Sequence, residues 1–179
     1  CCILIWMDER HDDRRGSYMS VLNQYSFVII GLIALTLSVV VLRRYTASWP
    51  VSLGAALTLA ALLLTGYFLL RPGASDAQNA GDAFALIESS GKPTVLEFFS
   101  NFCAGCLAVR PVVDRLAAEI ADEFNVLRVD IHTEPGLTLR ARYRFSYTPE
   151  FIVFDRTGRE VWRAHVPPDK SALNLARTG

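Results

Sequence analysis

The chain has 179 residues, 51% of them hydrophobic, and its 18 basic and 18 acidic residues leave no formal net charge. A nucleic-acid-binding protein usually carries a basic excess, so this balance argues against nucleic acid as a partner. The mean hydropathy of +0.27 is high for a soluble domain, and we therefore expect membrane-spanning segments.

Residues 1–20 form an N-terminal tail in which a short apolar stretch is followed by mixed charges. The tail begins with cysteine rather than methionine. We expect it to contain translated sequence from upstream of the natural start, which would then be Met7 or Met19.

Two apolar runs follow the tail, over residues 21–42 and 46–70, and neither contains a charged residue. Each is close to the ~20 residues that a helix needs to cross a bilayer. Two buried core helices in tandem would be unusual in so small a protein. A cleaved signal peptide is disfavoured because Arg43 and Arg44 follow the first run directly. The short connection predicts a two-helix transmembrane hairpin with both chain ends on one side.

The orientation of this hairpin depends on which arginines are present in the protein. With a start at Met19, Arg43 and Arg44 of the loop dominate and are expected in the cytoplasm, which places the rest of the chain on the extracytoplasmic face. If the tail is present, its arginines favour the opposite orientation. We expect the first arrangement, partly because of the family resemblance described below.

Residues 71–81 are mostly small and polar and predict a flexible linker. A soluble domain is expected over 82–179. Its expected elements are a short helix over 82–91, a strand over 93–100, a helix over 107–124, a strand over 125–131, a helix over 136–145, a β-hairpin with strands over 150–155 and 160–166, and a helix over 168–177. Strands that alternate with helices predict an α/β fold with one parallel pair, to which the hairpin adds antiparallel strands.

Two cysteines with two residues between them, Cys103 and Cys106, lie where the first strand gives way to the long helix. The first turn of a helix has free N–H groups and the positive end of the helix dipole, and both stabilise a thiolate. Cys103 is therefore expected to have a lowered pKa and to act as a nucleophile. Cys106, one turn further on, can resolve a mixed disulfide formed at Cys103.

Other uses of the pair remain as alternatives. A structural zinc site needs four ligands, and the sequence has no second pair of this kind beside the domain, so no metal is expected. A copper-binding chaperone could hold Cu(I) with the two thiolates and His165. A third possibility is an inert pair in a non-catalytic docking module.

The domain resembles the thioredoxin superfamily over residues 82–176. The resemblance rests on the cysteine pair, the preceding "LEFFSNFC", Pro111 in the following helix, and the segment "YRFSYTPEFIVFD" with Pro149. It implies a thioredoxin-like fold, with a central mixed sheet flanked by helices, after the transmembrane hairpin. It also implies a redox-active disulfide between Cys103 and Cys106 and no other cofactor.

The resemblance further implies roles for single residues. Cys103 would attack and Cys106 would resolve, while Pro149 would be cis and Thr148 would offer backbone groups to an extended substrate. Glu97 falls on the position of the family's buried acid and would relay a proton to or from Cys106; the alternative is an ordinary carboxylate at the strand's polar edge. The remaining substrate-binding positions are Phe102, Ala104 and Gly105.

Some positions depart from the family pattern. Phe102 stands where thioredoxins usually have tryptophan, and Ala104-Gly105 replaces Gly-Pro; with no charge between the cysteines, a reducing couple is expected. The glycine near the end of the last strand is replaced around Ala164-His165, which leaves the shape of the substrate groove open.

Together these features predict a two-pass protein of the cell membrane that is a thiol–disulfide oxidoreductase. We expect a reductase of disulfides in exported or membrane proteins, apocytochrome c among them. Its expected partners are protein disulfides, the lipid bilayer, and a membrane or thioredoxin-like electron donor.

Overall fold

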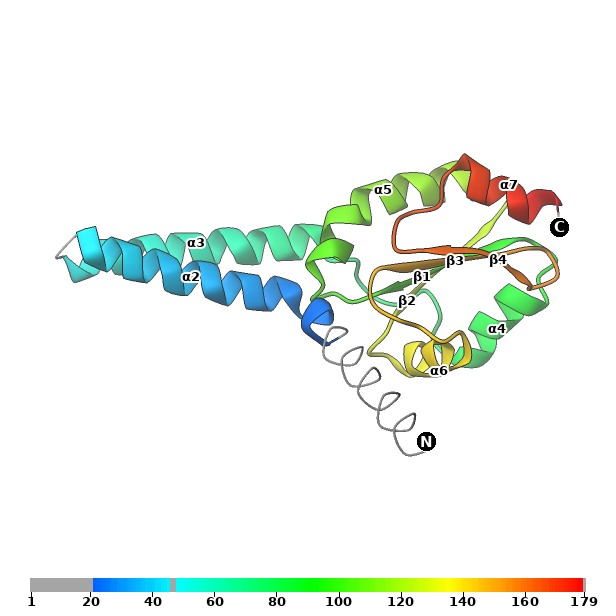
Figure 1. The fold of residues 1–179 in the computed structure, drawn as a ribbon, viewed down its shortest axis with the longest axis horizontal. Helices are drawn as coiled ribbons and strands as arrows, with labels where there is room; N and C mark the ends of the chain where they lie inside the picture. The colour runs from blue at the N-terminus through cyan, green and yellow to red at the C-terminus, as the bar shows by residue number, and fades with distance from the viewer. Residues whose placement is uncertain (1–20, 46–47, 179) are drawn as a thin grey trace, which may run out of the picture.

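A pair of long helices projects from one end of an α/β domain in the computed structural model, which describes residues 21–45 and 48–178 (Figure 1). The expected tail over 1–20, with its candidate starts Met7 and Met19, lies outside the described residues. So does the start of the second apolar run at Thr46.

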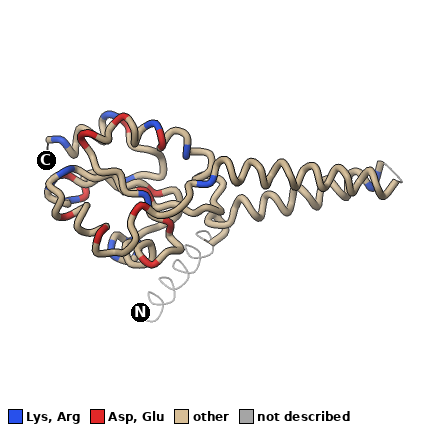
Figure 2. The backbone as a smooth tube through the Cα atoms, turned by 180° about the vertical axis from the view of Figure 1, so that it is seen from behind, with Lys and Arg blue, Asp and Glu red and all other residues tan. Residues whose placement is uncertain are grey.

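The projecting helices are α2 (Ser26–Tyr45) and α3 (Trp49–Leu70). Both are long and apolar enough to cross a membrane, and neither is buried against the rest of the structure. The first apolar run does not form one unbroken helix from residue 21, because a turn at Tyr25 separates a helical stretch over 21–24 from α2. At its other end α2 continues through Arg43 and Arg44, which were expected in the loop. Figure 2 shows the charged residues gathered on the domain, at the hairpin tip and near its base.

The domain is a mixed sheet with helices on both faces (Figure 1). The strand order is β2-β1-β3-β4; β1 runs parallel to β2 and antiparallel to β3, and β3 runs antiparallel to β4. The elements are α4 (Ala80–Glu88), β1 (Thr94–Phe99), α5 (Ala104–Ile120), β2 (Asn125–Asp130), α6 (Glu134–Arg142), β3 (Glu150–Phe154), β4 (Glu160–Ala164) and α7 (Lys170–Thr178). The expected order of elements and the mixed sheet are confirmed. Helices α5 and α7 cover one face and α4 and α6 the other.

The buried strand β1 divides the core into two layers, because successive side chains of a strand point to opposite faces. Leu96 and Phe98 belong to a cluster with residues of α4 and α6. Val95 belongs to the cluster beneath α5 and α7. Phe99, at the end of the strand, packs against Cys103 and Cys106. The cysteine pair therefore packs against the end of a fully buried central strand.

Helices α5 and α6 begin earlier than expected, and the reason is capping. Helix α5 begins at Ala104 rather than 107, because the Sγ of Cys103 accepts the N–H of Cys106 and makes Cys103 the N-cap. Helix α6 begins at Glu134 rather than 136, because Thr133 caps it and Pro135 fits the first turn.

Residues 73–76 of the expected linker are hydrogen-bonded to the domain. The side chain of Asn101 bonds both backbone groups of Gly73, at 2.9 and 2.8 Å. Asp76 pairs with β2 through two bonds of 2.8 Å to the backbone of Arg128. The edge strand β2 leaves backbone groups open, and the linker satisfies them.

Candidate active site

The cysteine pair lies at the junction of β1 and α5, beside the base of the helical hairpin (Figure 1). A tight turn after β1 is closed by the N–H of Cys103, which donates to the carbonyl of Ser100 at 3.2 Å. The N–H of Cys106 then donates to the Sγ of Cys103 at 3.3 Å. Both cysteines are thiols in this structure, and both have 0% of their surface exposed.

The two thiols differ in acidity. A hydrogen bond from Cys106 lowers the pKa of Cys103 to about 6; burial opposes the shift, and Thr148 and backbone N–H groups add to it. Burial and the neighbouring Cys103 raise the pKa of Cys106 far above its ordinary value. At neutral pH the pair therefore consists of a Cys103 thiolate and a Cys106 thiol, and the attacking and resolving roles of the two residues stay a prediction.

The loop before β3 lies against the pair. The Thr148–Pro149 peptide bond is cis. The carbonyl oxygen of Thr148 is 3.7 Å from the Sγ of Cys103. A Cβ at Gly105 would lie 3.3 Å from the Cδ of Pro149, so the small residue at 105 allows the loop to approach α5. The structure thus brings Thr148, Pro149 and Gly105 together around the thiolate.

Phe102 and Ala104 both contact the hairpin, although 37% of the surface of Phe102 stays exposed. The ring of Phe102 is stacked with Tyr25 at 5.8 Å and with Tyr67 at 6.2 Å between centroids. The N–H of Ala104 donates to the Oγ of Ser26 at 2.9 Å. Sequence reasoning did not anticipate these contacts, although the polar residues at the start of the first apolar run were a signal that this end can make polar contacts.

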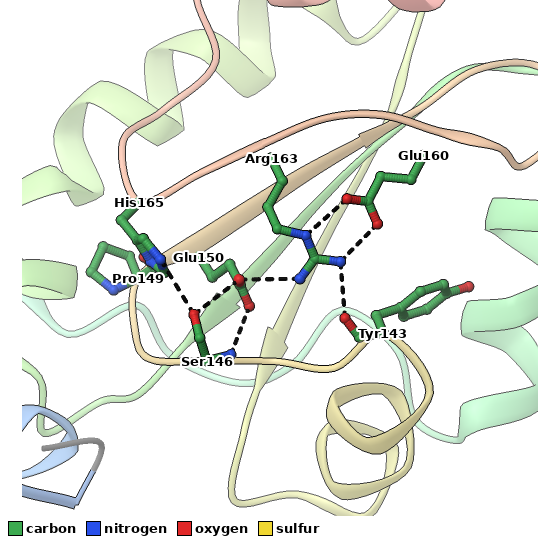
Figure 3. A network of polar contacts seen from close by, with 7 residues as sticks. All are labelled: Tyr143, Ser146, Pro149, Glu150, Glu160, Arg163 and His165. Carbon is green, nitrogen blue, oxygen red and sulfur yellow. Dashed lines mark hydrogen bonds and ion pairs between the residues drawn. The ribbon is translucent and has the colours of Figure 1, made fainter. Parts of the chain in front are cut away.

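A polar network contacts the cis-proline loop (Figure 3). The Nδ1–H of His165 donates to the carbonyl of Pro149 at 2.9 Å, and its ring is stacked on Tyr147 at 3.6 Å. Arg163 pairs with the buried carboxylate of Glu150 at 3.1 Å. Ser146 contacts both His165, at 3.3 Å, and Glu150. His165, which stands where a glycine was expected, thus holds the loop in place.

Glu97 is buried on the central strand, with 1% of its surface exposed. The alternative of an ordinary edge carboxylate is therefore wrong. Burial raises the pKa of Glu97 to about 7, and Arg128 opposes the shift by an ion pair of 2.9 Å. Among the described residues, the Oε1 of Glu97 has no hydrogen-bond partner. The carboxyl can therefore change protonation near neutral pH, and its role as a proton relay stays a prediction.

We expect the pKa of Glu97 to appear in the pH dependence of stability. The folded value of about 7 lies above the ordinary value of 4.5, so its contribution is complete below pH 4.5 and is lost as the pH rises through 7. The shift corresponds to about 3 kcal/mol between these limits. Relative to Glu97→Gln, the wild type should lose about this much unfolding free energy between pH 4.5 and 7.5, measured by urea unfolding of the full chain in detergent.

The matched control is Glu119→Gln, which changes an exposed carboxylate of α5. This variant should follow the wild-type dependence. If the unfolding free energy of Glu97→Gln has the same pH dependence as that of the wild type, the titration of Glu97 is not the cause of that dependence.

Several residues of the site escaped the sequence analysis. His132 contacts the Oγ of Ser100 at 3.2 Å, and its ring lies against Tyr25 at 5.6 Å. Asn101 bridges Gly73 and Asp130. Neither residue belongs to a recognisable sequence motif. Their partners are far away in sequence and are brought close only by the fold.

The described residues contain no group of three or more histidine, cysteine or acidic side chains placed to hold a metal ion. His165, the candidate third ligand for copper, already binds the carbonyl of Pro149. No observation in the described part of the chain thus favours the copper-binding alternative.

Comparison with known proteins gives a consistent result. The family model described as Thioredoxin matches residues 78–174. A thioredoxin of Mycobacterium bovis is 32% identical over 99 residues, which are 55% of this chain and 79% of that protein. A bifunctional thioredoxin reductase/thioredoxin of Mycobacterium leprae is 32% identical over 107 residues, covering 55% of this chain and 23% of that protein.

A thiol:disulfide interchange protein TxlA homolog of Synechocystis is 27% identical over 108 residues, covering 59% of this chain and 60% of that protein. The chain thus spans less than two thirds of the bifunctional relative and of this one. Among solved structures, the thioredoxin Deadhead of Drosophila melanogaster matches with a TM-score of 0.47 and 22% identity, covering 57% of this chain and 95% of that one.

Proposed function

Because the chain belongs to the thioredoxin family, we propose that it is a thiol–disulfide oxidoreductase held at a membrane by its helical hairpin. The observation that carries the proposal is the unequal cysteine pair: Cys103 caps a helix beside the Thr148–Pro149 loop, and Cys106 is buried behind it. This arrangement supplies one nucleophile and one resolving thiol.

The reaction runs in two exchanges. The Cys103 thiolate attacks one sulfur of a substrate disulfide, the substrate S–S bond breaks, and the other substrate sulfur leaves as a thiolate. Cys106 then loses its proton and attacks the Sγ of Cys103, which releases the second substrate sulfur and forms the Cys103–Cys106 disulfide. The substrate gains two electrons, and the pair must receive two from a membrane or thioredoxin-like donor.

Glu97 is our candidate acceptor for the proton of Cys106. A group that accepts a proton works best when its pKa is near the working pH, and burial brings the pKa of Glu97 to about 7. It lies on the same face of β1 as Phe99, which packs against Cys106. Arg128 holds one carboxylate oxygen, so the other is available for the proton.

The substrates we propose are disulfides of membrane or exported proteins, for example apocytochrome c. Two apolar helices meet the domain at its active-site end, so the thiolate would face the bilayer surface (Figure 1). With Arg43 and Arg44 at the hairpin tip on the cytoplasmic side, the domain lies on the extracytoplasmic face.

The test of the proposal is the reduction potential of the full chain in detergent, equilibrated in glutathione or dithiothreitol buffers. We expect one two-electron couple on the order of −250 mV, near the reducing end of the family. The uncharged Ala104-Gly105 pair is the reason, since it does little to stabilise the reduced form.

Two other results would contradict the proposal in different ways. A potential near −120 mV would indicate disulfide formation rather than reduction. If no reversible couple appears, the enzymatic role fails, and Cu(I) binding by the same chain becomes the next assay.

A further inference from the structure

Residues 23–27, which we call the cap segment, contact residues on either side of Cys103 and the loop that faces it, although they are far from the cysteine pair in sequence. The amide of Asn23 donates to the carbonyl of Thr148 and lies 3.4 Å from its Oγ1. The Oγ of Ser26 accepts the N–H of Ala104 at 2.9 Å. The cap segment therefore contacts both the helix that carries the thiolate and the loop that faces it.

Three more contacts complete the cover. The N–H of Phe27 donates to the carbonyl of Phe102 at 3.0 Å, and Ser100 donates to the carbonyl of Gln24 at 3.1 Å. The ring of Tyr25 is stacked on Phe102. The carbonyl of Phe102 and the N–H of Ala104 are the backbone groups on either side of Cys103, and both are bonded to the cap segment.

The cover has a direct chemical consequence. A thiolate must approach a disulfide sulfur along the axis of the S–S bond, which requires open space in front of it. Cys103 has 0% of its surface exposed, and Thr148 has 1%. The carbonyl of Thr148, a backbone group that an extended substrate would use, already accepts a hydrogen bond from the Asn23 amide. In this arrangement neither the sulfur nor the loop can receive a substrate.

We infer that the cap segment is an intramolecular competitor for the substrate site, and that the docked domain is the closed state of the enzyme. The inference rests on the proposed function, whose thiolate it regulates. Catalysis then requires residues 23–27 to leave the site. The apparent affinity for any substrate is the affinity of the open state multiplied by the fraction of chains that are open.

The competitor also selects the substrate. Because the cap segment is tethered, its effective concentration at the site is high, and a small disulfide with few contacts cannot displace it. A protein disulfide that offers backbone groups to Thr148 and an apolar side chain to Phe102 replaces both kinds of contact. The favoured substrate is therefore a disulfide within an extended, apolar protein segment rather than a small-molecule disulfide.

The test is the rate of Cys103 alkylation by iodoacetamide in the reduced full chain in detergent. Cys1 and Cys2 are replaced by serine, and the product is located by mass spectrometry. The double variant Asn23→Ala/Ser26→Ala should raise the high-pH plateau rate about tenfold, the factor expected from the loss of two ordinary hydrogen bonds. The midpoint of the pH profile should remain near the Cys103 pKa of about 6.

Two further variants make the result decisive. Tyr25→Ala removes the stack on Phe102 and should raise the plateau in the same direction, which guards against a double variant that fails to fold. Ser38→Ala/Thr58→Ala is the control, because these hydroxyls donate to carbonyls of their own helices, and it should behave as the wild type.

Equal plateau rates in the wild type and both cap variants would overturn the inference, as would a change confined to the midpoint. Alkylation needs no turnover, so this result is independent of the reduction potential. If alkylation depends on the cap segment but no reversible redox couple is found, the inference about the cap segment stands and the proposed enzymatic role is wrong.

Discussion

Replacing Cys103 by serine should lower disulfide reductase activity about a thousandfold or more, because the hydroxyl stays protonated where the thiolate is the nucleophile. The depressed pKa of about 6 means that the wild-type sulfur is mostly ionised at pH 7. The measurement is reduction of a protein disulfide by the full chain in detergent with dithiothreitol as electron source. Four cysteines are present in the chain, so Cys1→Ser/Cys2→Ser is the background for every variant.

Cys106→Ser is the companion variant, and its expected result is different in kind. Cys103 can still attack, but nothing resolves the product, so a mixed disulfide with the substrate should accumulate and be visible as a mass increase. If Cys103→Ser retains the cellular role of the protein, the docking-module alternative is correct; if it retains reductase activity, Cys103 is not the nucleophile. If Cys106→Ser turns over as fast as the background, resolution does not depend on this thiol.

Replacing Gly136 by alanine should destabilise the domain by about 3 kcal/mol, although alanine is the better helix former by ~1 kcal/mol. A Cβ at this position would lie 2.0 Å from the carbonyl oxygen of Asp130 and 2.9 Å from the Cα of Ile131. Both are backbone atoms, so the clash can be relieved only by moving α6 away from the end of β2. The measurement is urea unfolding of the full chain in detergent.

The control is Leu137→Ala, which changes the next residue of the same helix. Leu137 is exposed, so its truncation should alter the unfolding free energy by less than ~1 kcal/mol. The end of β2 that Gly136→Ala would displace includes Asp130, which is hydrogen-bonded to Asn101 in the active-site turn. A Gly136→Ala chain as stable as the wild type would mean that α6 does not approach β2 this closely.

Much of the fold could be predicted because its signals are local. Charge-free runs of membrane-spanning length, alternating strands and helices, and a cysteine pair at a strand-to-helix junction are each properties of one stretch of chain. The order of elements, the mixed sheet and the division of roles between Cys103 and Cys106 follow from such stretches. Element ends were less accurate where a capping side chain, such as Thr133, starts a helix earlier.

Glu97 shows where local reasoning ends. Its place on a strand next to the cysteines could be read from the sequence, and its burial could be expected. Its partner could not, because Arg128 stands opposite only through the register of β1 with β2. That partner holds one oxygen of the carboxylate and opposes the effect of burial on its pKa.

The sequence by itself determined the two apolar helices, the α/β domain and the cysteine chemistry, because periodicity and spacing act within single elements. Only the tertiary structure decided that the linker is bound to β2 and that residues 23–27 cover Cys103. Many of those contacts are made to backbone groups, such as the carbonyls of Phe102 and Thr148. Every residue carries such groups, so their pairing leaves no trace in the sequence, and the fold alone selects which of them meet.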